Sequence, residues 1–120
     1  PAIYLTQKLD IAVVGIGYPN EKSAIMATGY FKENEIESLI DRKVAGELCM
    51  QFYDIYGDTA PYKDDNNVIG MDISMLRSVP RSIGIAGGVE KLRAVRGAIN
   101  GHYINTLITD IECAEALISE

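Results

Sequence analysis

The chain has 120 residues, 48% of them hydrophobic and 23% charged, the composition of a globular domain with a modest core. Its net charge of −6 argues against nucleic-acid binding by this segment alone, because phosphate contacts need clustered Lys and Arg. No apolar run reaches the ~20 residues that span a membrane and no signal peptide is visible, so we expect a cytoplasmic protein. Because the chain begins at Pro1 and reaches a strand almost at once, we expect a fragment of a longer protein.

The first half of the chain predicts strands and short helices. Ile11–Ile16 is a continuous apolar run ended by Gly17, which is typical of a strand buried on both faces in a parallel sheet. Capping residues and apolar spacing predict helices over residues 20–28 and 35–42. Residues 48–55 are rich in aromatic and apolar side chains and predict a second strand.

The middle of the chain is polar and predicts a hairpin-like insertion. Residues 57–67 contain Pro61 and a run of Asp and Asn, which indicates a turn or a long loop. Residues 68–71 are short and apolar and predict the returning strand. Residues 74–79 predict a short helix or turn, which Pro80 ends.

The last third of the chain alternates strands with helices. Residues 82–86 and 104–108 predict buried strands, and residues 89–100 predict a helix that Gly101 ends. The expected apolar stripe of this helix is Val89, Leu92, Val95 and Ile99. A capping box over residues 109–112 predicts a final helix, whose expected apolar face is Ile111, Ala114, Leu117 and Ile118.

Buried strands that alternate with helices indicate a single α/β domain over residues 1–120, with an open and mostly parallel sheet. In such sheets, ligands bind beyond the carboxyl ends of the strands. Three segments at these ends carry glycine or polar residues: 15–17, 87–88 and 109–110. We expect them to converge on one crevice.

The stretch from Ile85 to Lys91 is the most informative part of the sequence. It is an apolar strand that runs into Gly87 and Gly88 and then opens a helix. Adjacent glycines let the backbone approach a ligand closely, and a helix start offers unpaired N–H groups to an anion. Lys91 in the first turn opposes the helix dipole, which suggests a phosphate between them. A tight turn with a solvated lysine explains the same residues equally well.

Other candidate motifs are weaker. Segment 15–17 lacks the third glycine of a dinucleotide fingerprint, since Asn20 takes its place, so we expect no nicotinamide cofactor. Asp54 closes an aromatic strand and suits a sugar hydroxyl, although a turn-forming role is favoured locally. Cys49 and Cys113 are expected to be reduced and buried. No metal-ligand spacing and no nucleophile–base arrangement is present, so we expect neither a metal nor nucleophilic catalysis.

The order of the motifs is more specific than any single one. They follow one another through the chain as residues 10–17, Gly46-Glu47-Leu48, Phe52-Tyr53-Asp54 with Gly57, Val68-Ile69-Gly70, residues 79–83, Ala86-Gly87-Gly88 with Lys91, and residues 107–110. This series resembles the effector-binding domain of SorC/DeoR-type bacterial transcriptional regulators. The resemblance covers almost the whole chain and corresponds to the later part of that domain.

The resemblance implies a Rossmann-like sheet similar to the NagB/RpiA/CoA-transferase-like fold, which binds a phosphorylated sugar or related metabolite. It implies ligand contacts by Lys91 and Asp54, with Gly87, Gly88 and Gly17 lining the pocket. It also implies operator binding through an N-terminal helix-turn-helix outside this chain, a homodimer or homotetramer, and no enzymatic activity.

This chain departs from the family pattern in two segments. The family usually shows Gly-Asp-Ile where this chain has Gly46-Glu47-Leu48, and often shows an Arg where Asn67 stands. In members that have it, this Arg can help to bind a second anionic group, so Asn67 is a ligand-binding position that argues against a bis-phosphorylated effector. The alternatives are a sugar-phosphate isomerase or deaminase-like enzyme, with Asp54 or Asp110 as general base, and a purely structural assembly domain.

Overall fold

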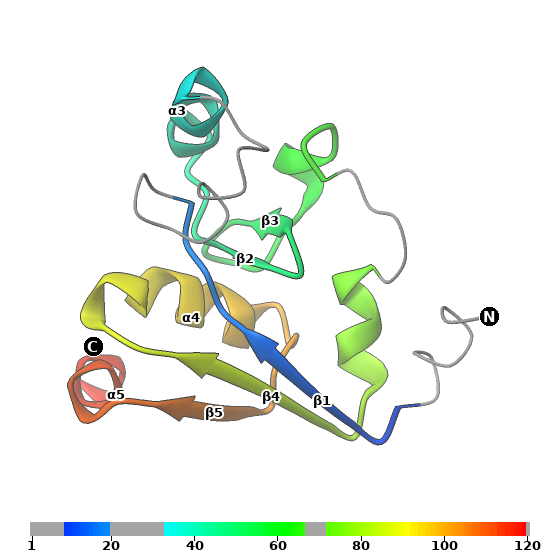
Figure 1. Ribbon diagram of the computed structural model, residues 1–120, viewed down its shortest axis with the longest axis vertical. Coiled ribbons are helices and arrows are strands. Elements are labelled where there is room, and N and C mark those ends of the chain that lie inside the picture. Colours follow the sequence, from blue (N-terminus) through cyan, green and yellow to red (C-terminus); the bar gives the residue numbers. More distant parts are fainter. Residues whose placement is uncertain (1–8, 20–32, 67–71, 120) are drawn as a thin grey trace.

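The computed structural model describes residues 9–19, 33–66 and 72–119, which form a parallel sheet, an antiparallel hairpin and flanking helices (Figure 1). The strands are β1 (Ile11–Gly15), β2 (Gly46–Leu48), β3 (Gln51–Tyr53), β4 (Arg81–Ala86) and β5 (Thr106–Thr109). The α-helices are α3 (Glu33–Asp41), α4 (Leu92–Asn100) and α5 (Ile111–Ile118), and the 3₁₀ helices are η1 (Ala60–Tyr62), η2 (Ile73–Ser78) and η3 (Val89–Lys91). The helix expected over residues 20–28 and the strand expected over residues 68–71 lie outside the described residues.

The larger sheet confirms the expected mostly parallel α/β architecture. Its strand order is β1-β4-β5 and both pairings are parallel. Val13 lies opposite Ile83, and Ile83 lies opposite Thr106. The carboxyl ends of the three strands therefore lie at one edge of the sheet.

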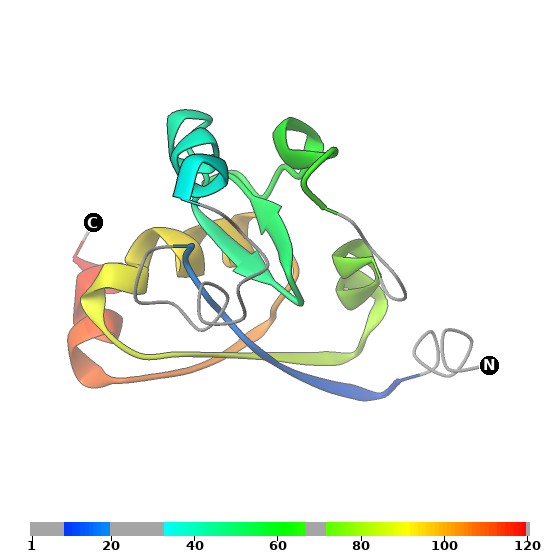
Figure 2. The same cartoon turned by 45° about the horizontal axis from the view of Figure 1, so that its top comes forward.

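Burial of the strands on both faces, as the apolar runs predicted, is wrong for this sheet. Ala12 is buried, whereas Ile11 and Val13 are 58% and 59% exposed, since side chains alternate between the two faces of a strand. Cys113 of α5 belongs to the same core cluster as Ala94 and Val95 of α4. In Figure 2 the helix α4, the β2–β3 hairpin and α3 lie on the same side of the sheet.

The strand expected over residues 48–55 is instead a tight hairpin. β2 and β3 pair antiparallel, with Leu48 opposite Gln51, so the two-residue turn between them is Cys49-Met50. Both turn residues have positive φ, 52° and 64°. Such turns favour Asn and Gly, so the sequence carried no signal for a turn here.

The hairpin lies directly on α4 through two glycines. A Cβ on Gly46 would lie 2.6 Å from the Cβ of Ala94, and a Cβ on Gly97 would lie 2.6 Å from the ring of Tyr53. The buried Tyr53 hydroxyl donates a hydrogen bond of 2.7 Å to the Ala94 carbonyl. Close backbone approach thus fixes the hairpin over the helix that follows the glycine pair.

This close packing corrects the apolar stripes expected for the helices. The segment expected as one helix over residues 89–100 begins as η3 and continues as α4, and Val89 and Ile99 are 49% and 42% exposed. The buried residues of α4 are Ala94, Val95, Gly97 and Ala98. Small side chains are needed there because the hairpin leaves little room.

The final helix buries only part of the expected face, since Leu117 packs against the core and Ala114 is half-buried. Ile111 and Ile118 are 73% and 84% exposed, and Cys113 is buried. The N-cap is Asp110, not Thr109, because the Asp110 side chain accepts the Cys113 N–H. Cys113 fulfils the expectation of a buried free thiol, whereas Cys49 is free and exposed.

Arg77 and Tyr103 connect η2 to the end of α4. Arg77 Nε donates to the Gly101 carbonyl at 2.7 Å, and its guanidinium lies 4.7 Å from the centroid of the Tyr103 ring. Tyr103 in turn donates its hydroxyl hydrogen to the Gly57 carbonyl at 2.5 Å. Arg77 therefore stabilises the turn that ends α4. None of the described helices is long and apolar enough to cross a membrane.

Candidate functional site

The residues predicted for the site lie beyond the carboxyl ends of β1 and β4, where the rule for parallel sheets expects a ligand. Gly17 follows β1 and pairs with Glu47 of β2: Gly17 N–H donates to the Glu47 carbonyl at 3.0 Å, and Glu47 N–H donates to the Gly17 carbonyl at 2.8 Å. β4 ends at Ala86, and Gly87 and Gly88 lead from it into η3, which ends with Lys91. The first strand and the hairpin thus meet at Gly17.

Lys91 lies within electrostatic reach of the Glu47 carboxyl. Burial raises the pKa of the half-buried Glu47 carboxyl above its ordinary value, and the Met50 N–H and the positive charge of Lys91 offset only part of this rise. Lys91 is also half-buried. A hydrogen-bond acceptor and a donor of opposite charge therefore influence each other near the ends of the strands.

The Glu47 side chain is held over Gly17 by a hydrogen bond to one of its oxygens. Oε2 accepts the Met50 N–H at 2.9 Å, across the strained hairpin turn. Oε1 lies over Gly17, where an added Cβ would come within 2.2 Å of it. Gly17 is needed because the carboxylate occupies the space that any other side chain would fill.

Asp110 accepts a hydrogen bond from the Gly88 N–H, one of the backbone groups that the sequence predicted would bind an anion. Gly88, with a φ of 94°, donates its N–H to Asp110 Oδ2 at 2.6 Å, and Cys113 donates its N–H to Oδ1 at 2.8 Å. These two N–H groups hold the pKa of Asp110 below its ordinary value. The end of β5 is thereby joined to the glycine pair, and the Gly88 amide already has a negatively charged partner.

Asp54 lies apart from Lys91. Its Oδ1 accepts the N–H groups of Tyr56 and Asp58, both at 2.9 Å, as a turn-forming Asp does. A Cβ on Gly97 would meet the Asp54 carbonyl at 2.6 Å. Gly97 is six residues beyond Lys91, roughly 9 Å along a helix, so the structure does not place the two predicted contacts side by side.

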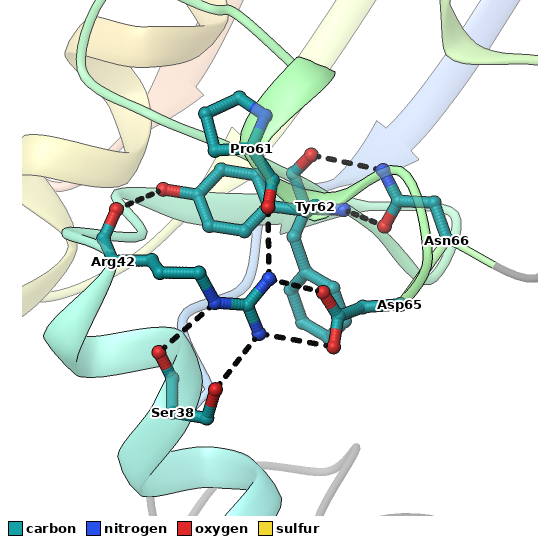
Figure 3. A network of polar contacts seen from close by, with 7 residues as sticks. Ser38, Arg42, Pro61, Tyr62, Asp65 and Asn66 are labelled. Carbon is teal, nitrogen blue, oxygen red and sulfur yellow. Dashed lines mark hydrogen bonds and ion pairs between the residues drawn. The ribbon is translucent and has the colours of Figure 1, made fainter.

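Asn67 lies outside the described residues, but the segment before it is firmly held (Figure 3). Arg42 donates to the Pro61 carbonyl and to both carboxylate oxygens of Asp65, at 2.6 and 3.1 Å. Asn66 accepts the Phe52 N–H at 2.7 Å and donates to the Phe52 carbonyl at 3.1 Å, as a neighbouring strand would. This network ties the polar loop to the end of α3 and to β3.

Glu47 is the residue that sequence reasoning missed as a site residue. The only signal in the sequence was its place in Gly46-Glu47-Leu48, where the resembled family shows an acidic residue. Among the residues that the structure describes, no group of three or more His, Cys, Asp or Glu side chains could hold a metal ion.

Comparison with known proteins places this arrangement in a family. The sequence model of the family described as "Putative sugar-binding domain" matches residues 1–119. The sorbitol operon regulator of Klebsiella pneumoniae is 38% identical over 110 residues, which are 92% of this chain and 35% of that protein. The deoxyribonucleoside regulator of Bacillus subtilis is 31% identical over 118 residues, 98% of this chain and 37% of that protein.

The chain belongs to the sugar-binding domain family of SorC/DeoR-type regulators. Solved structures agree with this assignment, which confirms the resemblance drawn from the motifs. Full-length SorC from K. pneumoniae matches with a TM-score of 0.82 and 35% identity, over 96% of this chain and 37% of that one. A DeoR family regulator from Listeria monocytogenes matches with a TM-score of 0.87 and 26% identity, over 96% and 47% of the two chains. The chain spans little more than a third of the length of the curated relatives it matches.

Proposed function

We propose that this chain is the effector-sensing part of a bacterial transcriptional regulator and that its effector is a phosphorylated sugar or a related carbohydrate metabolite. Family membership and relatives named for a sorbitol operon and for deoxyribonucleosides support the proposal. The structural observation that carries it is the Glu47 carboxylate over Gly17, with Lys91 within electrostatic reach, at the end of a parallel sheet where ligands bind.

The pair suits the hydroxyl groups of a sugar. A hydroxyl both donates and accepts hydrogen bonds, so one group can donate to the Glu47 carboxylate and accept from the Lys91 ammonium. A phosphate dianion in the same place would be drawn to Lys91 but repelled by Glu47 and Asp110. We therefore assign sugar oxygens, not the phosphate, to Lys91.

The proposal also includes the other residues predicted to line the pocket or contact the ligand. Gly17, Gly87 and Gly88 form the backbone around the pair, with Gly88 fixed by Asp110. Asp54 and Asn67 remain predictions as ligand contacts, because the Asp54 carbonyl lies beside Gly97, six residues beyond Lys91, and Asn67 lies outside the described residues.

Regulation would follow from a population shift. The protein would exchange between two assembly states, such as a dimer and a tetramer. The effector would bind one of them more tightly and so raise the fraction of protein in that state. Operator binding would belong to a helix-turn-helix elsewhere in a cytoplasmic polypeptide, since this segment carries a net charge of −6.

A regulator needs no general base, and neither nominated carboxylate is positioned as one. Asp54 Oδ1 closes a turn, and Asp110 uses both oxygens on backbone N–H donors. We therefore propose that the protein binds sugar phosphates without converting them. Consumption of any sugar phosphate by the purified protein would contradict this part of the proposal.

Calorimetric titration tests the proposed function. A panel of sugar phosphates and the matching free sugars is titrated into the natural polypeptide that carries this chain. We expect one sugar phosphate to bind, Lys91→Ala and Glu47→Gln to weaken it by about tenfold or more, and the exposed Lys63→Ala to leave it unchanged. Failure of every sugar phosphate, or full affinity in Lys91→Ala, would overturn the proposal.

A further inference from the structure

The register of the sheet brings the end of β5 next to the glycine pair. Ala86, the last residue of β4, lies opposite Thr109, the last residue of β5. Gly87 and Gly88 therefore leave the sheet close to Asp110, as the adjoining ends of β4 and β5 in Figure 1 show. Asp110 accepts the Gly88 N–H on Oδ2 at 2.6 Å. One carboxylate thus joins two neighbouring connections between a strand and a helix.

The other oxygen of this carboxylate is anchored to the protein core. Asp110 is the N-cap of α5 and accepts the Cys113 N–H on Oδ1 at 2.8 Å. Cys113 is fully buried and belongs to the core cluster that contains Ala94 and Val95 of α4. The start of α5 therefore has a fixed position relative to α4, and Asp110 extends that fixed position to the Gly88 amide.

The turn that leads to Lys91 needs a hold of this kind. Glycine loses more conformational freedom on ordering than any other residue, and two glycines stand in succession here. Gly88 is the N-cap of η3 and has no side chain with which to cap it, and its carbonyl accepts the Lys91 N–H at 3.1 Å. An unbroken series of hydrogen bonds therefore runs from Lys91 through Gly88 and Asp110 to Cys113.

We propose that Asp110 is a positioning residue for effector binding, which fixes the Gly88 turn and so holds Lys91 in the place where it meets the effector. Asp110 acts through Lys91 and makes no contact with the effector itself. The inference rests on the proposed function, because it takes Lys91 as an effector contact. Displacing a contact residue by about 1 Å can cost up to a hundredfold, so loss of this hold should be measurable as a loss of affinity.

Two isosteric substitutions separate this role from a simple effect of charge. Asn and Asp are equally good N-caps, so Asp110→Asn can keep the bond from Cys113, but an NH₂ group then replaces the oxygen that accepts the Gly88 N–H. Glu112→Gln is the matched control, since it removes one negative charge from the first turn of α5 and leaves Asp110 in place. Asp110→Ser is the second test variant, because its short hydroxyl can cap α5 but leaves the Gly88 N–H without its acceptor.

Hydrogen exchange of the natural polypeptide without effector tests the hold on the turn. Exchange is followed by mass spectrometry on the peptides that cover residues 87–92 and 113–117. We expect residues 87–92 to exchange at least about tenfold faster in Asp110→Asn and Asp110→Ser, and at the parent rate in Glu112→Gln. Residues 113–117 should keep the parent rate throughout, which shows that α5 stays folded. Unchanged exchange of residues 87–92 in both Asp110 variants would overturn the inference.

Calorimetric titration with the sugar phosphate that binds the parent tests the action through Lys91. We expect both Asp110 variants to weaken it by about tenfold, Glu112→Gln to leave its affinity unchanged, and Asp110→Asn to have no further effect in a Lys91→Ala background. Parent affinity in both Asp110 variants would overturn the inference and leave the proposed function intact. A loss that persists in the Lys91→Ala background would also overturn it, because Asp110 would then contact the effector directly. Failure of every sugar phosphate to bind the parent would overturn the proposed function, and the inference with it.

Discussion

Replacing Gly17 with Ala tests whether the Glu47 carboxylate belongs to the binding site. A Cβ on Gly17 would lie 2.2 Å from Glu47 Oε1, and contacts under 3.0 Å are essentially never seen. Because the obstacle is the end of a flexible side chain, we expect the carboxylate to retreat by roughly 1 Å while the backbone stays in place. This movement breaks or lengthens the 2.9 Å hydrogen bond from Met50 N–H, at a cost of about 1 kcal/mol in stability.

We expect Gly17→Ala to reduce the free energy of binding by a larger fraction than it reduces the free energy of unfolding. Misplacing one acceptor of a sugar hydroxyl is worth about 1.4 kcal/mol, so Gly17→Ala should weaken the best sugar phosphate by about tenfold in calorimetry. Urea unfolding measures the accompanying loss of stability. In a Glu47→Ala background there is no carboxylate to displace, so Gly17→Ala should have no further effect on affinity. An unchanged Kd in the single variant, or a loss that persists without the Glu47 carboxylate, would refute this reasoning.

Three further predictions concern the structure around the site. Gly97→Ala should lower the free energy of unfolding by about 1–2 kcal/mol in urea, because crowding against Tyr53 exceeds the gain of about 1 kcal/mol in helix propensity; an unchanged midpoint would contradict the close packing. Asp110→Asn should be less stable than the parent above pH 3.8, the ordinary pKa of the group, and the difference should disappear as the pH falls through the lower folded-state pKa; urea midpoints at several pH values check this, and a constant difference would exclude it. Cys49→Asn combined with Met50→Gly should raise stability by about 1–2 kcal/mol in thermal unfolding, since both turn residues have positive φ; no gain would mean that the turn is unstrained.

The sheet could be predicted from the sequence because its signals are local and strong. The apolar runs at Ile11–Ile16 and 82–86 correspond to β1 and β4, and η2 lies where a short helix was expected before Pro80. These apolar runs could not show which face of the sheet other elements would cover. An apolar side chain such as Val13 has the same sequence signal whether or not a helix packs on it.

The hairpin and the helix faces were missed for a different reason. Cys49-Met50 adopts a turn that its own side chains disfavour, so the turn depends on the pairing of β2 with β3 and on the Glu47 carboxylate. The buried face of α4 is set by the approach of this hairpin, which selects Gly97 and small neighbours over the larger Ile99. Tertiary contacts therefore overrode the apolar periodicity.

The residues of the candidate site that follow the parallel strands could be predicted from the sequence, whereas the one from the hairpin could not. The rule for parallel sheets placed Gly17, the glycine pair and Asp110 at one edge, and the structure joins Gly88 to Asp110 there. Glu47 could not be found in this way, because it comes from the hairpin and reaches the edge only through its pairing with Gly17. A constellation drawn from a sheet and an insertion has no fixed spacing in sequence.

The position of the carboxylates changes what Lys91 is expected to bind. The sequence placed a phosphate between Lys91 and the helix start, because both are positive and need a negative partner. In the structure the Gly88 amide has Asp110 as that partner, and Lys91 has Glu47 within electrostatic reach. A group that enters here must therefore be neutral overall while it donates to one residue and accepts from the other. Sugar hydroxyls meet this requirement, so the hydroxyl pattern, read by Glu47 and Lys91, is what we expect to decide which effector is bound.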